Sequence, residues 1–593
     1  MADIIRLLPD SIANQIAAGE VVQRPASVVK ELLENSIDAG ATSIRVIIRD
    51  AGKQLIQVID NGRGMSDADA RMCLERHATS KISRADDLFS LRTMGFRGEA
   101  IASIAAVSQL EIRTRQQEAE TGTVITVEGS VVRRQEPDAC PAGTSVSVRN
   151  LFYNIPARRN FLKGNPVELR HIIDAFNQVA LAHTDAGFML VHGDEVLSDL
   201  PPAKLGQRIV SIFGKPYQQQ LASCNEEMEQ VRIWGYVGRP ELARRTRAEQ
   251  FFFVNNRFIR SPYLHHAVMN GFEGLLPEGS YPFYTLFIEI DPSLIDVNVH
   301  PNKIEIKFTD DRIVYSLLKV AVRHALGTHQ LVPPLDFSGN INLMENLKQD
   351  ASRAHQEVLR EQTGNSNLRH WQELFRDEPE RQESAQSPGL PFQLQTSSGT
   401  GQADEPPRDR ILFQLQDRFI IREVSQGLMI IDQQAAHERV LFDRFYAQSK
   451  NKDGASQQLL FPVTIDLSAA DFVLLSGMLQ ELHAIGFRLE PFGKQNMLLS
   501  GVPPEVAGRE REIIDGLLEQ FRMQQDRLDT GIADRLAGAL ARRAAIRRGQ
   551  RLDREQLESL VRGLFSSPEP SLTPDGQPTF FIFEASRMEG FFS

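Results

Sequence analysis

The chain has 593 residues, which is too long for a single hydrophobic core, so about three or four domains are expected. Its 41% hydrophobic and 24% charged residues are typical of a soluble globular protein, and no apolar run approaches the roughly 20 residues that cross a bilayer. This composition argues against a membrane protein. The net charge of −11 argues against a chain coated with nucleic acid, but it leaves room for a local basic groove.

The cysteines and the N-terminus bear on the compartment. The chain contains three cysteines without paired spacing, which argues against a disulfide framework or a cysteine-based zinc site and fits a reducing cytoplasm. Asp3 and Asp10 flank a short apolar patch that lacks the layout of a signal peptide.

The first strong pattern is a helix predicted to start at Pro25 and to end near Gly40. Glu31 and Asn35 lie four positions apart and therefore share one face of it. An amide oxygen is a hard ligand for Mg²⁺, and a carboxylate can take a proton from an attacking water. The pair therefore suits a metal-nucleotide site, although a solvated face of an ordinary amphipathic helix would carry the same residues.

Two β-strands are predicted next, over residues 44–49 and 54–60. The second strand runs into Asp60-Asn-Gly62-Arg-Gly64. Glycines allow the backbone to approach a flat ligand, and an aspartate at a strand end can accept a hydrogen bond from an exocyclic amine. Because Asn-Gly is also common in hairpin turns, this segment alone does not decide between the two interpretations.

Three short segments follow that are also candidates for contacts with a nucleotide. Residues 77–82 read His-Ala-Thr-Ser-Lys-Ile, residues 94–100 enter an apolar helix predicted over 101–107, and Gly143-Thr144 begins an alternating strand that extends to residue 148. A glycine-framed segment that enters a helix offers backbone N–H groups and a positive dipole end to phosphates. Each segment is a weak signal when taken singly.

Taken together and in order, four pieces form a specific pattern: Glu31…Asn35, Asp60-x-Gly62-x-Gly64, Gly95-x-x-Gly98 and Gly143-Thr144. The pattern resembles the ATP-binding signature shared by the ATPase component of DNA gyrase, Hsp90 chaperones, histidine kinases and MutL proteins. Within that group the sequence motifs are most similar to those of MutL proteins. They match nearly residue for residue at residues 12–25, 76–81, 95–100, 151–159 and 296–303. By this resemblance, which covers about residues 1–330, the chain is identified as a member of the MutL family.

The resemblance implies a multidomain fold of α/β and α+β classes. Residues 1–205 would form a Bergerat-type ATPase α/β sandwich, and residues 206–330 an α+β transducer domain that resembles ribosomal protein S5. Residues 331–405 are rich in Pro, Gln, Ser and Gly, which predicts a flexible linker. Residues 406–593 would form an α/β C-terminal dimerisation domain.

The resemblance also assigns roles to individual residues. Glu31 would activate the water that attacks the γ-phosphate, Asn35 would hold Mg²⁺, and Asp60 would bind the adenine amine. Lys303 would reach the γ-phosphate from the transducer domain and report its presence. The remaining ATP-binding residues would be Gly62, Gly64, Thr79, Ser80, Lys81, Gly95, Phe96, Arg97, Gly98 and Thr144.

Two basic clusters are candidates for contacts with DNA phosphates. One follows residue 149 and includes Arg158 and Arg159 with interleaved aromatic residues, and the other spans residues 244–260 and includes Arg257 and Arg260. Such side chains suit backbone contacts without base reading. For any single arginine a solvated surface is an equally good interpretation, but two clusters in an acidic chain favour a DNA-facing groove.

The C-terminal region begins with two predicted strands, at 411–416 and 427–432, followed by a helix from about Gln434. Residues 432–443 resemble the MutL endonuclease motif, but Gln434 stands at its histidine position and Asp443 at its last glutamate. Arg542, Thr573 and Asp575 stand where the family's soft metal ligands are expected, and no cysteine follows residue 224. We therefore expect that nuclease activity is absent and that Asp432 and Glu438 serve as helix-cap and surface ion-pair residues. The alternative is a metal-dependent nicking endonuclease of mismatch repair with a non-standard carboxylate site.

Gln457-x-x-Leu460-x-Pro462 fits the short pattern by which repair and replication proteins dock on the sliding clamp, and it is predicted to lie in a loop before a strand at 463–467. The last predicted strand covers residues 578–584.

The resemblance implies DNA mismatch repair by a homodimeric, ATP-gated clamp and matchmaker with weak ATPase activity and ATP and Mg²⁺ as cofactors. Its partners would be MutS, DNA bound without sequence specificity, the sliding clamp and a downstream nuclease or helicase, in the cytoplasm and associated with the nucleoid. Two other functions are considered. A gyrase-like topoisomerase would need an acidic cleavage motif, which is not found in the sequence. Chaperones lack the mismatch-repair motifs of residues 76–159.

Overall fold

The computed structural model describes residues 10–82, 84, 93–95, 97–228, 230–245, 249–277, 279–296, 306–328, 412–493, 495–523 and 532–589. The predicted linker, Phe96 and Lys303 lie outside these residues. The chain divides into two compact units, one of residues 1–354 with 446–539 and the other of residues 355–445 with 540–593. Within the described part, no helix is long and apolar enough to cross a membrane.

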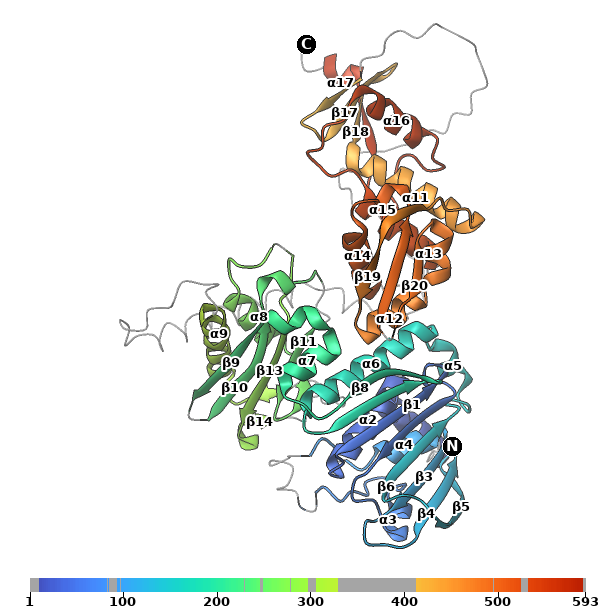
Figure 1. Ribbon diagram of the computed structural model, residues 1–593, viewed down its shortest axis with the longest axis vertical. Coiled ribbons are helices and arrows are strands. Elements are labelled where there is room, and N and C mark those ends of the chain that lie inside the picture. The colour runs from blue at the N-terminus through green and yellow to red at the C-terminus, as the bar shows by residue number, and fades with distance from the viewer. Residues whose placement is uncertain are drawn as a thin grey trace, which may run out of the picture. The chain divides into compact units, whose positions relative to one another are not determined.

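An eight-stranded mixed sheet dominates the N-terminal 200 residues, with strand order β5-β4-β3-β6-β2-β1-β7-β8 (Figure 1). The strands are β1 (Ser43–Arg49), β2 (Leu55–Asp60), β3 (Gln109–Arg115), β4 (Gly122–Glu128), β5 (Val131–Asp138), β6 (Gly143–Arg149), β7 (Gly187–His192) and β8 (Glu195–Leu200). The helices are α1 (Asp10–Val21), α2 (Pro25–Asp38), α3 (Asp67–Met72), α4 (Ala100–Ala106), α5 (Pro156–Phe161), α6 (Asn165–Ala182) and α7 (Leu205–Phe213).

Helix α2 forms where the sequence predicts it. Pro25 occupies its first turn, where a missing N–H costs nothing, and Val28, Val29, Leu32 and Leu33 are buried in the core. Alternate residues of β1 join the same core, while the others face outward. The opposite, polar side of α2 is thereby left free to line a cavity.

The sheet register brings two predicted motif residues together. β2 pairs antiparallel with β6, and Asp60 stands opposite Thr144. The predicted strands at 44–49, 54–60 and 143–148 are confirmed as β1, β2 and β6.

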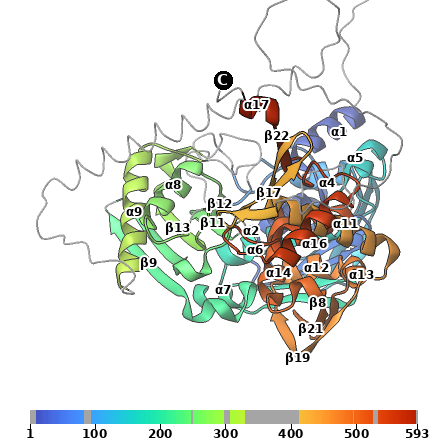
Figure 2. The same cartoon turned by 90° about the horizontal axis from the view of Figure 1, so that it is seen from above.

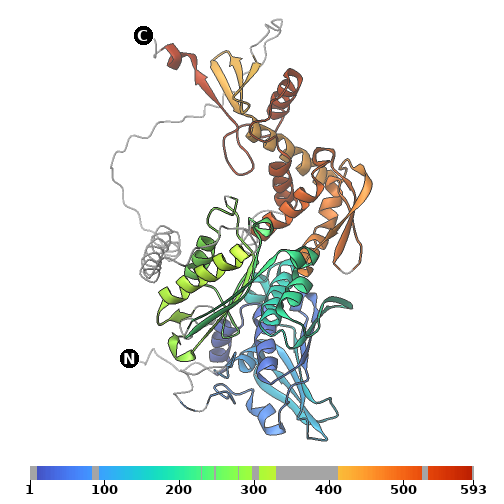
Figure 3. The same cartoon turned by 60° about the vertical axis from the view of Figure 1, so that its left-hand side comes forward.

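A second sheet of five strands has the order β12-β11-β13-β10-β9, and helices α8 and α9 lie along one face (Figures 2 and 3). In β11 the residues Phe252 and Val254 face these helices, whereas Phe251 and Phe253 join the core of the N-terminal sheet. This alternation gives the second sheet two buried faces. The elements are β9 (Leu221–Met228), β10 (Val231–Gly238), β11 (Gln250–Val254), β12 (Arg257–Ile259), α8 (Pro262–Gly271), β13 (Tyr284–Ile290) and α9 (Asp311–Thr328), beside a short pair, β14 (Ile295–Asp296) and β15 (Lys307–Phe308).

The C-terminal region contains two further sheets, ordered β16-β17-β18-β22 and β19-β21-β20. The first consists of β16 (Leu412–Leu415), β17 (Phe419–Val424), β18 (Gly427–Asp432) and β22 (Phe580–Glu584), and the second of β19 (Gln457–Asp466), β20 (Arg488–Pro491) and β21 (Asn496–Val502). The helices are α11 (Gln433–Asn451), α12 (Ala469–Ser476), α13 (Leu479–Ile485), α14 (Glu510–Met523), α15 (Ile532–Ala544), α16 (Arg554–Phe565) and α17 (Ala585–Glu589).

The prediction of only two strands before α11 was wrong, because β17 lies between them. β16 and β17 form a hairpin whose turn residues, Gln416 and Asp417, have φ values of +52° and +48°. Tight hairpin turns with positive φ usually contain glycine or asparagine, and this turn contains neither. The usual hairpin signal is therefore absent from the sequence.

Candidate nucleotide-binding site

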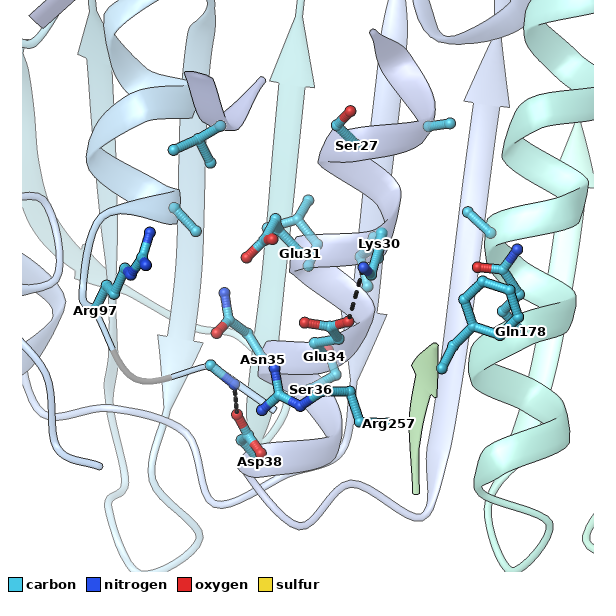
Figure 4. Close-up of a pocket in the computed structure, with 18 of the residues that line it drawn as sticks. Ser27, Lys30, Glu31, Glu34, Asn35, Ser36, Asp38, Arg97, Gln178 and Arg257 are labelled. Carbon is cyan, nitrogen blue, oxygen red and sulfur yellow. Dashed lines mark hydrogen bonds and ion pairs between the residues drawn. The ribbon is translucent and has the colours of Figure 1, made fainter. Parts of the chain in front are cut away.

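One face of α2 lines a cavity of about 1820 Å³. Glu31 and Asn35 lie one helical turn apart on it, and their side chains point in the same direction (Figure 4). Lys30 forms an ion pair with Glu34 at 3.7 Å on the neighbouring row. The cavity is larger than most small-molecule sites and also reaches Arg257 in β12 and Arg260, which follows that strand.

Asp60 is held rigidly at the end of β2. The Ser36 hydroxyl donates to its Oδ2 at 2.8 Å, and the backbone N–H groups of Gly62 and Thr144 donate to its Oδ1 at 2.9 and 3.3 Å. Burial raises the pKa of Asp60, and the three hydrogen bonds only partly oppose this shift. The result is a fixed, half-buried acceptor on the wall of the cavity, which suits recognition of an amine donor.

A lysine ammonium is held between two oxygens of α2. Lys81 Nζ lies 2.9 Å from Asn35 Oδ1 and 2.6 Å from Asp38 Oδ2. Both side chains of the ion pair are largely buried, with 15% and 6% exposure. Hard oxygen donors that hold one cation are also the ligand type that Mg²⁺ prefers, so the residues present fit that ion.

Asp38 also fixes the segment that leads to α4. Its two carboxylate oxygens accept hydrogen bonds from the N–H groups of Met94 and Gly95, at 3.0 and 3.1 Å. The motif reading of the sequence missed Asp38, although it follows Asn35 by three positions and therefore lies on the same helix face. Ser36 was missed as well, because only the folded chain brings it to Asp60.

The segments predicted to cover the phosphates lie against each other. The His77 N–H donates to the Gly98 carbonyl at 3.2 Å, and a Cβ on Gly98 would lie 2.3 Å from the Ala78 carbonyl oxygen. Gly98 has a φ of +63°, so glycine is required there for both conformation and space. Thr79, Ser80, Lys81, Gly95, Arg97 and Gly98 all line the cavity.

The sequence suggested that the two glycines after Asp60 let the backbone approach a ligand, but their observed contacts are with the protein itself. Gly64 has a φ of +68°, and a Cβ on it would lie 2.1 Å from the Arg115 carbonyl oxygen. Gly64 lines the cavity, whereas Gly62 contributes through its hydrogen bond to Asp60. Their roles in ATP binding remain predictions.

The four arginines predicted to contact DNA differ in their surroundings. Arg159 and Arg260 are exposed, while Arg158 is half-buried. Arg257 lines the cavity, and its Nη2 donates to the Thr93 carbonyl at 2.9 Å. Burial lowers the pKa of Arg257, and Glu34 with other carboxylates of α2 opposes the shift. The structure therefore places Arg257 beside the candidate nucleotide site, while a role of all four in DNA binding remains a prediction.

The C-terminal carboxylates have partners of the expected kind. Asp432 Oδ1 accepts hydrogen bonds from the N–H groups of Gln434 and Ala435, each at 3.0 Å, and so caps α11 as predicted. Glu438 forms the predicted ion pair, with Arg542 at 3.5 Å, but the prediction of a surface position was wrong, because Glu438 is buried with 8% exposure. Arg542 also contacts Asp575.

Asp443 forms a bidentate pair with Arg439, at 2.7 and 3.0 Å. Among the described residues, no group of three or more His, Cys, Asp and Glu side chains is placed to hold a metal ion.

The predicted clamp-docking motif does not lie in a loop. Gln457 and Gln458 pair with β21, and the pairing resumes at Val463 after a shift in register. The interrupted stretch carries Leu460 and Phe461, which are 89% and 78% exposed. The motif is thus part of strand β19, but its apolar residues project from an irregularity in that strand.

Comparisons with known proteins match three parts of the chain. Residues 23–149 match the family described as histidine kinase-, DNA gyrase B- and HSP90-like ATPase, residues 209–327 the C-terminal domain of DNA mismatch repair protein, and residues 412–552 the MutL C-terminal dimerisation domain. Among solved structures, the N-terminal domain of a DNA repair protein aligns at a TM-score of 0.47 and 24% identity, over 54% of this chain and 100% of that one. The Aquifex aeolicus MutL ATPase domain complexed with ADP aligns at 0.37 and 25%, over 50% and 98%.

The relatives extend over the full length. The DNA mismatch repair protein MutL of Flavobacterium psychrophilum is 42% identical over 100% of both chains, and that of Christiangramia forsetii is 44% identical over 99% of both. The MutL of Bacteroides fragilis is 42% identical, again over 100% of both chains. The chain belongs to the MutL family of DNA mismatch repair proteins.

Proposed function

We propose that the protein is an ATPase of mismatch repair in which nucleotide binding and hydrolysis switch a dimer between open and closed forms. The observation that carries this proposal is the convergence of Glu31, Asn35 and Asp60 on one cavity, with Lys81 held between Asn35 and Asp38. A carboxylate, an amide oxygen and a fixed acceptor are the groups that water activation, metal binding and adenine recognition require.

Each residue would have a distinct task in hydrolysis. Glu31 takes a proton from the attacking water, and the Asp60 carboxylate accepts a hydrogen bond from the adenine amine. Asn35 would hold Mg²⁺, which neutralises phosphate charge when bound. Lys81 and the segment that contains Gly95 and Gly98 would lie over the phosphates, and Lys303 is proposed to sense the γ-phosphate from the transducer domain.

The proposed dimer is held together by one face of the C-terminal sheet. The pairing registers place Phe413, Ile421, Ile430 and Phe581 side by side across its four strands. The opposite face, with Ile420, Met429 and Ile431, packs in the core with α16. Phe413, Leu415 and Phe581 are 45%, 46% and 55% exposed, and such an apolar face suits a second copy of the chain in a domain that matches a dimerisation family.

The finer cellular role follows from family membership together with the surfaces described above. Exposed arginines such as Arg159 and Arg260 suit DNA phosphates without sequence preference, and the segment around Leu460 suits the sliding clamp. ATP would close the N-terminal domains around DNA, so that a MutS–mismatch complex is linked to a downstream nuclease or helicase. In this scheme the nucleotide shifts a population of conformers and does no chemistry on DNA.

The decisive test compares ATP hydrolysis by the wild type with that of Glu31→Ala. Loss of a general base typically lowers a rate by about 10²–10⁴-fold, and we expect this loss with ATP binding retained. Glu118→Ala, which removes an exposed carboxylate from the turn after β3, is the matched control and should turn over at the wild-type rate. Equal turnover in Glu31→Ala and the control would contradict the proposed role of Glu31.

A further inference from the structure

The guanidinium of Arg158 lies directly against the last turn of α1. A Cβ built on Gly19 would lie 1.8 Å from Arg158 Nη2 and 2.8 Å from its Cζ, so the space beside Gly19 that a larger residue would fill holds this guanidinium. Arg158 Nη1 is buried and makes no hydrogen bond within the described residues. Its neighbour Arg159, on the same short helix α5, is exposed.

Helix α5 is anchored by hydrogen bonds of the segment that precedes it. In the segment that leads into it, Phe152 is fully buried, and its N–H donates to the Val107 carbonyl at 2.7 Å. The Asn154 side-chain amide donates to the Ala106 carbonyl at 2.8 Å. Both contacts tie the start of α5 to the end of α4, against which α1 also packs (Figure 2). Arg158 therefore contacts α1 from a helix whose position is fixed by these hydrogen bonds.

The position of α1 matters to the cavity. Gly19 is followed at once by Glu20, Val21, Gln23 and Arg24, which line the cavity. Helix α1 has no basic residue of its own in its last turn. The last carbonyls of a helix lack intrahelical partners and carry partial negative charge, so a cation from another element is favoured there.

We propose that Arg158 is a positioning residue that seats the C-terminal turn of α1 and thereby holds the wall of the nucleotide cavity formed by residues 20–24. The guanidinium acts on ATP affinity through α1, and the phosphates of DNA are contacted by the exposed Arg159. This inference rests on the proposed ATPase function and extends it to a residue that the basic motif assigned to DNA.

The contact can be removed from either side. In Arg158→Ala the guanidinium is gone. In Gly19→Ala the three atoms nearest to the new methyl group all belong to the flexible end of the Arg158 side chain, so we expect the methyl group to expel the guanidinium and to leave the fold intact. Both variants should raise hydrogen–deuterium exchange of residues 10–21 and raise KM for ATP roughly three- to tenfold, the size of a helix-terminus charge effect, with kcat within about twofold of the wild type.

The double variant is the sharpest measurement. Alanine is a better helix former than glycine, so Gly19→Ala should be neutral or protective once Arg158 is absent. The exchange and KM of the double variant should therefore equal those of Arg158→Ala or return toward the wild type. Additive defects in the double variant would overturn the proposal.

Arg159→Ala is the matched comparison, because it removes the same charge from the adjacent position. It should weaken DNA binding and leave the exchange of residues 10–21 at the wild-type rate. If Arg158→Ala instead weakens DNA binding as Arg159→Ala does and leaves α1 exchange and KM unchanged, the proposal fails. Exchange of α1 in nucleotide-free protein stays measurable even if Glu31→Ala shows that the proposed ATPase function is wrong.

Discussion

At the scale of single residues, the partly buried Asp60 carboxylate lowers the stability of the fold at neutral pH but is proposed to bind the adenine amine. Burial raises its pKa, so the folded protein binds the proton more tightly than the unfolded chain does, and the stability this provides is lost as pH rises through the raised pKa. Asp60→Asn removes this titration and replaces one carboxylate oxygen by an N–H₂ group, so that one oxygen remains for the backbone N–H groups and the N–H₂ group can donate to the Ser36 hydroxyl. We expect the variant to be at least as stable as the wild type at pH 7 but unable to bind ATP, because an amide N–H₂ would face the adenine amine.

Urea unfolding between pH 4 and 7 together with nucleotide titration would measure both effects. The wild type should lose stability relative to Asp60→Asn as pH rises across this range. A variant that binds ATP normally would remove Asp60 from adenine recognition, whatever its stability.

Asp38 joins α2 to the segments that contain Lys81 and Gly95 and that line the cavity. Its carboxylate accepts from Lys81 and from the N–H groups of Met94 and Gly95. Removing it in Asp38→Ala leaves these donors without their partner, and hydrogen bonds to charged groups contribute about 1.5–3 kcal/mol each in favourable cases. We expect the free energy of unfolding to fall by about 2 kcal/mol or more, measured by urea denaturation. Asp199→Ala, which alters an exposed carboxylate on β8, should change it by less than about 0.5 kcal/mol.

At the scale of elements, the irregularity in β19 exposes two apolar side chains that contribute little to the stability of the fold. Leu460 and Phe461 are mostly exposed, so truncating both to alanine should leave the melting temperature within about 1 °C of the wild type. The same change should weaken binding to the sliding clamp at least tenfold, as measured by surface plasmon resonance. Phe492→Ala, which removes another exposed aromatic residue just after β20, is the control and should bind as the wild type does. Unchanged clamp binding in the double alanine variant would rule out this docking segment.

The elements also show what the sequence could and could not predict. Helix α2 and strands β1, β2 and β6 were predictable because Pro25, the buried periodicity and the glycines give strong local signals. The hydrogen bonds from Met94 and Gly95 to Asp38 could not be predicted, because residues 56 and 57 positions apart meet only through the fold. Strand β17 was missed because the turn at Gln416 and Asp417 lacks glycine. The motif around Leu460 was placed in a loop before a strand at 463–467, whereas it lies within β19 where a register shift interrupts the pairing.

At the scale of the whole molecule, the C-terminal sheet face should determine the oligomeric state. A two-fold interface contains each residue twice, so a charge in place of Phe581 is introduced at two points. Losing the burial of a phenylalanine costs about 1.5–3 kcal/mol per copy, which weakens the dimer about a hundredfold or more. Sedimentation of Phe581→Asp at micromolar concentration should show monomers, while Met228→Asp, an exposed site on β9, should stay dimeric. A dimeric Phe581→Asp would place the interface elsewhere.

The same variant tests whether the C-terminal tether serves the ATPase cycle. Tethered N-terminal domains meet at an effective concentration set by the predicted linkers, so turnover per wild-type protomer should not depend on protein concentration. In Phe581→Asp the N-terminal domains must meet by free diffusion. Its ATP turnover should therefore rise with protein concentration through the micromolar range, while ATP affinity at the cavity stays that of the wild type. Turnover that is independent of concentration in a proven monomer would show that hydrolysis does not require the two N-terminal domains to associate.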